Sequence, residues 1–348
     1  MEKKAPMDTT KEIADLKDKI KAQSQGATTL NISFIGIVNG LFESLGKNPA
    51  TSGELAMETK MDPEYVERWC DAAYAFGLLD AEDHQFRLSS LGEIMRPSHP
   101  QTSMPQVIQS VLGTHMSERI AGLMRTGERP GEVLLGERET VLPWFGPMLE
   151  TTFGPIFEKQ IFPAIPFFRE MDRDDALAID LGCGNGWYLR ALAKHSPRLS
   201  GLGVDGFREN IRQASLRAKE EGFGNRLSFT QGDIFSLKLD KKADMIAMNR
   251  ALHHVWSDKE RLFPMLRSYL APGGALVLWE PCWPKQREEL RSNGKRPLSF
   301  QNLGEHAQGN RLLNPDEIAE ECQKVGLKTT ISLFADGNES VVVAVNTP

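Results

Sequence analysis

The sequence is poor in the features that mark secreted, membrane-spanning and nucleic-acid-binding proteins. Only four cysteines occur in 348 residues and none has CxxC spacing, which favours a reducing compartment and packing roles for the thiols. The charged start lacks the apolar core of a signal peptide, and no apolar run approaches the ~20 residues that span a bilayer. Asp and Glu (47) outnumber Lys and Arg (41), so the basic excess of a nucleic-acid binder is missing. We therefore expect a cytoplasmic protein with no membrane or nucleic-acid partner.

The length and the changes of pattern along the chain predict more than one domain. Residues 1–25 have the composition of a polar arm, and the helix and turn signals of residues 26–100 predict a winged-helix-like domain, for which we expect a dimerisation role. Residues 101–170 are mostly helical, broken by prolines and rich in aromatic side chains, which predicts a connector that also forms a pocket wall. Residues 171–348 alternate between strand and helix patterns and form the expected ligand-binding domain.

Helix starts and a turn place the elements of the winged helix. Thr51 and Glu54 fit a capping box, and Asp62 followed by Pro63 fits a second helix start. Residues 78–90 alternate around a turn, which predicts a small hairpin. Two short helices followed by a hairpin indicate a winged helix.

A winged helix raises the possibility of a DNA-binding regulator, whose second helix would lie in the major groove. Here that helix has a single basic residue, Arg68, and a set of acidic residues: Asp62, Glu64, Glu67 and Asp71. Such a face repels phosphates. We therefore favour a structural or dimerisation role for this domain.

Residues 31–46 carry apolar side chains at helical spacing. So small an N-terminal module offers this face no obvious partner. We expect it to pack against a second chain, with the helices of residues 101–165 interleaved, in a homodimer.

The C-terminal half has the pattern of an open, mainly parallel, doubly wound α/β sheet. Helical segments separate most of the candidate strands, and Asp336-Gly337 predicts a closing hairpin between the last two. The candidate strands are residues 176–180, 202–205, 227–230, 245–248, 275–279, 329–333 and 340–345.

A glycine-rich loop follows the first of these strands in "ALAIDLGCGNGWYLRALAK". Glycines allow tight turns and close approach of the backbone to a ligand. The dinucleotide fingerprint G-x-G-x-x-G needs a small third residue at 187, but Trp187 occupies that place. Asp205 ends the next strand, where a carboxylate can accept hydrogen bonds from two ribose hydroxyls. Asp233 follows the third strand and can pair with an adenine amino group.

This D-x-G-x-G-x-G loop, the acidic end of the second strand and the Gly-Asp after the third resemble class I S-adenosylmethionine-dependent methyltransferases. The resemblance implies that the glycine loop cradles the methionine end of S-adenosylmethionine, Asp205 its ribose and Asp233 its adenine. The expected cofactor-binding residues are Asp180, Gly182, Gly184, Gly186, Asp205, Gly232, Asp233, Ile234 and Asn249.

The stretch "ALHHVWSDKE" follows the fourth strand, and Ser257 with Glu260 fits a capping box for the next helix. It resembles the H-x-W-x-D segment of small-molecule O-methyltransferases that have an N-terminal winged-helix dimerisation domain. The resemblance implies that His254 is the general base and that Glu280 orients it. His253 points the other way if strand alternation persists, which indicates a structural role.

A rival interpretation involves His306. The chain also looks like bacterial methyltransferases of α-keto acids, some of which hold a metal through two histidines. The resemblance implies that His254 and His306 are that pair, and Arg250 would then meet a substrate carboxylate. We expect a homodimeric S-adenosylmethionine-dependent methyltransferase of a small molecule. O-methylation is favoured, and C- or S-methylation of a small keto or hydroxy acid is the alternative.

Overall fold

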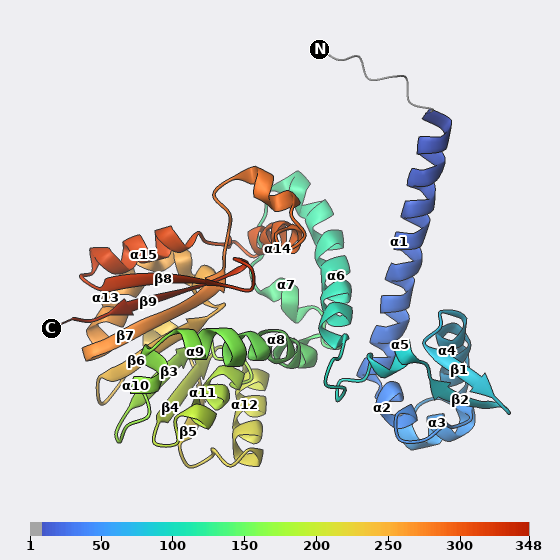
Figure 1. The fold of residues 1–348 in the computed structure, drawn as a ribbon, viewed down its shortest axis with the longest axis horizontal. Helices are drawn as coiled ribbons and strands as arrows, with labels where there is room; N and C mark the ends of the chain where they lie inside the picture. The colour runs from blue at the N-terminus through green and yellow to red at the C-terminus, as the bar shows by residue number, and fades with distance from the viewer. Residues whose placement is uncertain (1–8, 348) are drawn as a thin grey trace. The chain divides into compact units, whose positions relative to one another are not determined.

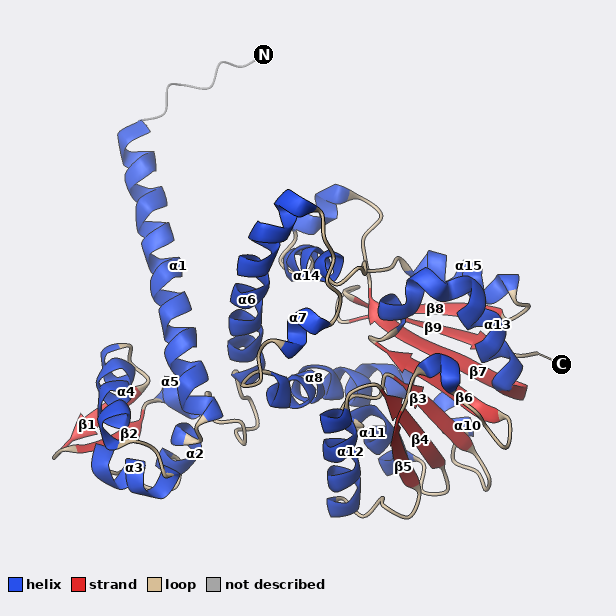
Figure 2. Cartoon of the chain, turned by 180° about the vertical axis from the view of Figure 1, so that it is seen from behind, coloured by secondary structure: helices blue, strands red, loops and turns tan. Residues whose placement is uncertain are grey.

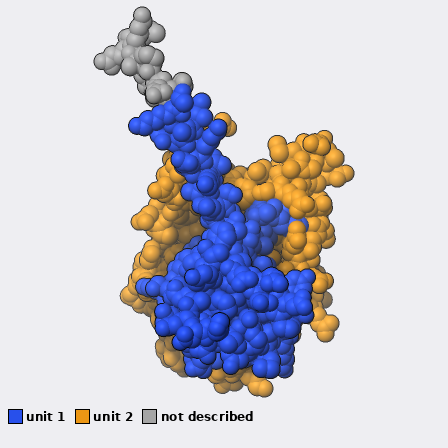
Figure 3. All heavy atoms as spheres, turned by 90° about the vertical axis from the view of Figure 1, so that its right-hand side faces the viewer, with its two compact units in different colours: residues 1–115 blue, residues 116–348 orange. Residues whose placement is uncertain are grey.

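A computed structural model describes residues 9–347, and the chain divides into two compact units, residues 1–115 and 116–348 (Figure 3). Part of the predicted arm, residues 1–8, lies outside the described residues. Helix α6 (Met104–Thr126) carries the chain from the first unit to the second. None of the helices in residues 9–347 has the length and apolar content needed to cross a bilayer.

The first unit contains the two predicted helix starts and the predicted hairpin (Figure 1). The Thr51–Glu54 capping box is present, and the Asp62 carboxylate accepts hydrogen bonds from two backbone amides of the helix that Pro63 begins. Both expectations are confirmed. The elements are α1 (Thr9–Val38), α2 (Leu41–Leu45), α3 (Ser52–Thr59), α4 (Pro63–Ala75), β1 (Leu79–Glu82), β2 (Gln85–Leu88) and α5 (Ser90–Glu93).

The apolar face predicted for residues 31–46 is buried within this same unit. The Phe42 ring packs edge-on against Trp69 at 5.4 Å between centroids, and the Trp69 indole donates to the carbonyl of Ile32. The expectation that this face lacks a partner within its own unit is therefore wrong, because α4 packs against it, and packing against a second chain stays a prediction. Several apolar side chains of this unit are exposed, and three near the start of α1 follow a 3–4 spacing: Ile13, Leu16 and Ile20.

The second unit begins with helices and continues as the predicted alternation of strands and helices. Its helices are α7 (Val133–Gly136), α8 (Leu142–Ile156), the π-helix η1 (Phe157–Ile161), α9 (Phe162–Ala164), α10 (Phe167–Glu170), α11 (Trp187–His195), α12 (Arg208–Glu220), α13 (Lys259–Tyr269), α14 (Arg296–Ala307) and α15 (Pro315–Lys324). The 3₁₀ helices are η2 (Ile234–Ser236), η3 (Leu252–Asp258) and η4 (Arg287–Arg291). Its strands are β3 (Leu177–Leu181), β4 (Ser200–Asp205), β5 (Leu227–Gln231), β6 (Ala243–Asn249), β7 (Leu270–Pro281), β8 (Lys328–Phe334) and β9 (Glu339–Val345).

These seven strands form one sheet in the order β5-β4-β3-β6-β7-β9-β8 (Figure 2). The pairs from β5 to β7 are parallel, and β9 runs antiparallel to both of its neighbours. All seven predicted strands and the closing hairpin are therefore confirmed. The strand order reverses between β3 and β6, which is where such sheets bind ligands at the carboxyl ends of their strands.

Strand alternation divides the core between the two faces of the sheet. Ala178 packs with α11 and the aromatic segment of residues 153–171, whereas its neighbour Ile179 packs with α13 and α15. Because both faces of the central strands are covered, β3, β6 and β9 are buried along most of their length, whereas β5 and β8 at the sheet edges are partly exposed. Polar side chains near the carboxyl ends of these strands therefore call for a functional explanation.

Candidate active site

The glycine loop between β3 and α11 has a backbone that other residues adopt only with strain. Gly182, Gly184 and Gly186 have φ angles of 75°, 53° and 73°. A Cβ at Gly182 would lie 2.5 Å from the Cβ of Ala251, whereas a Cβ at Gly184 would meet nothing within 4 Å. The loop therefore packs closely on one side and leaves open space beside Gly184.

Asp205 ties the glycine loop to the end of β4. One carboxylate oxygen accepts a hydrogen bond from the Gly184 amide at 2.9 Å. The other accepts from the Phe207 amide at 2.9 Å and from the Asn210 side chain at 3.0 Å. Carboxylate oxygens have several acceptor sites, so this geometry leaves capacity for the ribose hydroxyls expected here.

Asp180 is buried beside this loop, at 1% exposure, and neither of its carboxylate oxygens has a hydrogen-bond partner within residues 9–347. Burial, together with the negative charge of Asp205, raises the pKa of Asp180 to about 8. The side-chain oxygen of Asn249, at the end of β6, is also buried without a partner in the described chain. Unpaired buried polar atoms are costly, so this edge of the sheet fits a ligand that donates hydrogen bonds.

The segment after β5 lies next to Asp205, because the Gly232 amide donates to the Asp205 carbonyl at 3.0 Å. The Asp233 side chain is exposed and accepts hydrogen bonds from the Phe235 amide and the Ser236 hydroxyl. Ile234 begins η2 directly after it. The predicted cofactor residues therefore come together from the ends of β3, β4, β5 and β6.

The two histidines lie on η3, a 3₁₀ helix, and not on an extension of β6. Strand alternation therefore does not describe their orientation. The capping box expected for Ser257 and Glu260 is also wrong, because α13 begins at Lys259 after Asp258.

His253 is 3% exposed and lies between two carboxylates. Its Nδ1 is 2.6 Å from the Glu280 carboxylate, and its Nε2 is 3.6 Å from the Glu305 carboxylate. Burial lowers the pKa of His253, but the two glutamates, Glu280 more than Glu305, outweigh it and raise that pKa to about 10. Burial acts to raise the pKa of Glu305, yet His253 holds it at about 2. Glu280 thus contacts His253, and its expected contact with His254 is wrong.

His254 has a different environment. Its side chain is 26% exposed, and its Nδ1 lies 3.0 Å from Glu132 at the start of α7 and 3.0 Å from the Asn310 amide. A hydrogen bond with His254 lowers the pKa of Glu132. The ring of His254 packs on that of His253 with centroids 4.2 Å apart.

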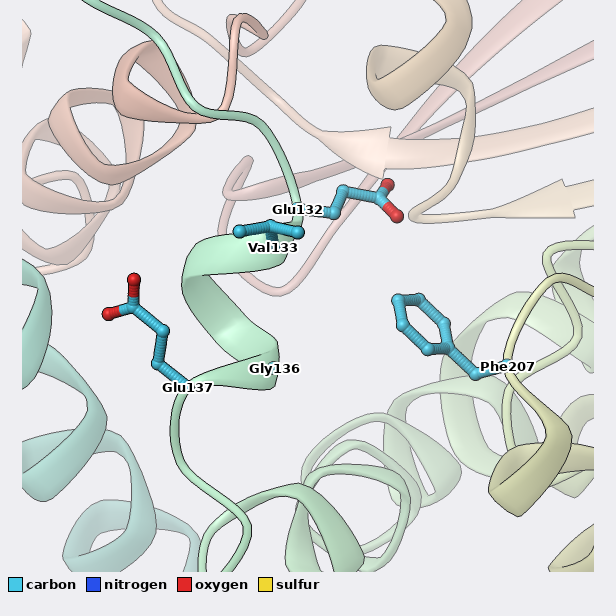
Figure 4. A pocket seen from close by; sticks show the side chains of 5 residues that line it. All are labelled: Glu132, Val133, Gly136, Glu137 and Phe207. Carbon is cyan, nitrogen blue, oxygen red and sulfur yellow. The ribbon is translucent and has the colours of Figure 1, made fainter.

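Glu132 also lines an open hollow of about 530 Å³ together with Val133, Gly136, Glu137 and Phe207 (Figure 4). Phe207 follows Asp205 by two residues, and Figure 4 shows its ring pointing from the loop after β4 toward α7. The hollow therefore lies between α7 and the loop that follows Asp205, and the carboxylate that contacts His254 is part of its lining.

Arg250 and His306 do not lie as the keto-acid interpretation requires. The Arg250 guanidinium is paired with the buried Glu339 at 2.8 and 2.9 Å and lies 4.1 Å from the centre of the Phe153 ring. His306 is exposed on α14, whereas Glu305 before it is buried against His253. Among the described residues, the groups close enough to hold one metal ion are His253, His254 and Glu305, with ligand atoms within 4.8 Å of one another.

Residues 178–274 match a family described as "Methyltransferase domain". The trans-aconitate 2-methyltransferase of Streptomyces avermitilis is 34% identical over 112 residues, which cover 32% of this chain and 41% of that enzyme. The aclacinomycin 10-hydroxylase of Streptomyces purpurascens is 23% identical over 312 residues, which cover 80% of this chain and 75% of that one. The chain spans less than half the length of the first four curated relatives.

Among solved structures, human N-acetylserotonin methyltransferase in complex with SAM has a TM-score of 0.71 at 15% identity and covers 100% of both chains. Residues 178–274 therefore belong to a methyltransferase domain, and the chain has the fold of that solved methyltransferase. An O-methyltransferase family protein from Burkholderia thailandensis shares this fold, with a TM-score of 0.70 at 18% identity over 96% of this chain and 98% of that one.

Proposed function

We propose that this protein transfers a methyl group from S-adenosylmethionine to a small-molecule acceptor, preferably a hydroxyl. The observation that carries the proposal is the buried, unpaired Asp180 carboxylate beside a glycine loop that is open at Gly184. Asp180 would meet the cofactor's ammonium group, Asp205 its ribose and Asp233 its adenine. When bound, S-adenosylmethionine supplies a methyl group on a positively charged sulfur. The acceptor nucleophile attacks the carbon of this methyl group.

Cofactor binding tests this proposal through the proton on Asp180. In the ligand-free protein its pKa of about 8 keeps this carboxyl protonated at pH 7. Contact with an ammonium favours the carboxylate, so binding releases a proton, and affinity rises with pH up to about 8. Calorimetry with S-adenosylmethionine in buffers of different ionisation enthalpy measures this release, and Asp180→Asn should abolish it. Stronger binding of NAD than of S-adenosylmethionine would refute the proposal.

We assign His254 as the residue that accepts the acceptor's proton. Imidazole has a suitable intrinsic pKa for this transfer, and His254 is the partly exposed member of the pair. When Nδ1 donates its proton to Glu132, the ring is fixed and Nε2 is left to accept the proton, whereas a hydrogen bond from Asn310 to Nδ1 requires the opposite tautomer. His253, with a pKa of about 10, already carries its proton at neutral pH.

A second candidate is a metal-dependent reaction on a keto or hydroxy acid, and the geometry of His253 favours it. A histidine that donates its Nδ1 proton to a carboxylate presents Nε2 to a metal, and Glu280 is placed for this arrangement. The 3.6 Å separation of Nε2 from the Glu305 carboxylate is too long for a hydrogen bond but suits two ligands of one ion. Elemental analysis of protein purified without a histidine tag distinguishes the two candidates. One equivalent of a transition metal that is lost in both His253→Ala and Glu305→Ala supports the metal.

Product analysis must separate methylation from oxidation, because the relative similar over 80% of this chain is named a hydroxylase. Mass spectrometry distinguishes a gain of CH₂ from a gain of oxygen. A hydroxylated product without a methylated one would replace methyl transfer as the activity.

We also propose that the protein is a homodimer. The supporting feature is the stripe of Ile13, Leu16 and Ile20, which are 52%, 55% and 64% exposed in the single chain. A monomer by light scattering at micromolar concentration would refute the homodimer.

The alternative function is that of a DNA-binding regulator. It predicts a gel shift with duplex DNA. The acidic side chains of α4 argue against this function, because they repel phosphates.

A further inference from the structure

Glu150, on α8, lies at the centre of an ionic network that includes the glycine loop. Its carboxylate accepts a hydrogen bond from the side-chain amide of Asn185, in the loop, at 3.0 Å. It also accepts from Arg190 of α11 at 2.6 Å and from Arg217 of α12 at 2.9 Å. One carboxylate outside the sheet therefore joins the loop to both α11 and α12.

Arg190 completes the hold on the loop. Its side chain is 1% exposed, and it donates to the backbone carbonyl of Asn185 at 2.6 Å and to Glu221 at 2.8 Å. Asn185 is itself fully buried, and its side-chain oxygen accepts from the Trp187 amide at 3.3 Å. Both the side chain and the carbonyl of Asn185 are thus fixed from outside the loop.

The packing of α8 on the loop leaves no room for a side chain at the point of contact. A Cβ at Gly146 would lie 2.8 Å from the Cβ of Asn185. The position of the loop therefore depends on α8, a helix that precedes the first strand of the sheet in the sequence.

We propose that Glu150 is a positioning residue for cofactor binding, which it controls by holding the glycine loop through Asn185 and Arg190. This inference rests on the proposed function, because it assigns that loop to the cofactor. Without the Glu150 charge, the buried Arg190 keeps one carboxylate partner, Glu221, and Arg217 loses its ion pair with Glu150. Loss of a carboxylate beside a buried guanidinium is expensive, so the side chains around Arg190 rearrange and the loop moves with them.

The experiment compares Glu150→Gln with a matched control, Glu158→Gln. Glu158 is 35% exposed and Glu150 is 30% exposed, and Glu158 also pairs with α11, through His195 at the end away from the loop. Three readouts are needed: the thermal midpoint, the affinity for S-adenosylhomocysteine by calorimetry, and hydrogen exchange of the amides of residues 182–187 without ligand.

We expect Glu150→Gln to weaken S-adenosylhomocysteine binding about tenfold and to accelerate exchange of the loop amides. The control should keep wild-type affinity and exchange, whatever its thermal midpoint. Wild-type affinity and loop exchange in Glu150→Gln would overturn the inference. If the wild-type protein does not bind S-adenosylhomocysteine but loop exchange still depends on Glu150, the proposed function fails while the hold on the loop stands.

Discussion

Two consecutive histidines, each paired with a glutamate, occupy contrasting environments. His253 and Glu280 are both almost completely buried, whereas His254 is 26% and Glu132 is 45% exposed at the side chain. Burial between two carboxylates raises the pKa of His253 to about 10, so this ring holds its proton firmly. The comparison shows that the surroundings, and not the motif, decide which histidine can exchange a proton during a reaction.

The largest expected effect follows removal of the exposed ring. His254→Ala should lower kcat by about a hundred- to ten-thousandfold, because a general base contributes that much. Affinity for S-adenosylhomocysteine should stay at the wild-type value, which calorimetry measures. If His254→Ala is fully active and His253→Gln is inactive, the general base is His253, paired with Glu280, and not His254.

Removal of the buried Glu280 carboxylate should lower the free energy of unfolding. Glu280→Ala leaves His253 with the more distant Glu305 alone, and breaking a buried charged pair costs about 3–5 kcal/mol. Urea denaturation monitored by circular dichroism gives this free energy of unfolding. A loss below about 1 kcal/mol would show that the pair is better solvated than its burial indicates.

The pH dependence of unfolding sharpens the contrast further. The folded-state pKa of His253, about 10, lies above the ~6.5 of an unfolded histidine. Its stabilising contribution is therefore complete below pH ~6.5 and is lost as pH rises toward 10. Glu305, at about 2 in the folded state, stabilises above pH ~4.3 and loses this contribution as pH falls toward 2. The urea concentration at the midpoint of unfolding should decrease both below pH ~4.3 and above pH ~6.5. In His253→Gln the decrease at alkaline pH should be smaller than in the wild-type protein.

The smallest effect is expected at the exposed carboxylate. Glu132→Gln should change the free energy of unfolding by less than about 1 kcal/mol, because half-exposed ion pairs contribute little. Its effect should appear in kcat, because the contact with Glu132 holds the His254 ring in the tautomer that accepts a proton at Nε2. Glu137→Gln, which alters another glutamate lining the same hollow, is the matched control. An unchanged kcat in Glu132→Gln would show that proton transfer does not depend on this contact.

The sequence was sufficient to predict the sheet and the cofactor edge, because their signals are local. Buried strands are continuous apolar runs, and the Gly182–Gly186 loop combines its turn residues within a few positions. The N-terminal helix starts were predicted for the same reason, since Thr51 and Asp62 satisfy amides only two or three residues away.

The acceptor side could not be predicted to the same depth. Glu132 and Asn310 lie more than 50 residues from His254, and nothing in their local sequence distinguishes them from other polar side chains. The sequence predicted that Glu280 contacts His254, whereas it contacts His253, and this error has a different cause. A 3₁₀ helix turns the chain by about 120° per residue, and an interpretation based on strand alternation misplaces the side chains. Arg250 was misjudged because its partner Glu339 lies 89 residues away on β9.

The first helix has a consequence for the local dynamics of the protein. In α1, residues 10–28 are exposed around the whole helix, so intrinsic propensity alone maintains it there. Isolated helices of this length are marginal in water, and Gly26 with the threonines after it weakens this one further. In a single chain this end of α1 therefore opens and closes rapidly, and the lysines in residues 11–21 become early sites of tryptic cleavage. A second copy that buries Ile13, Leu16 and Ile20 would protect the same bonds, so the rate of cleavage reports whether the helix is covered.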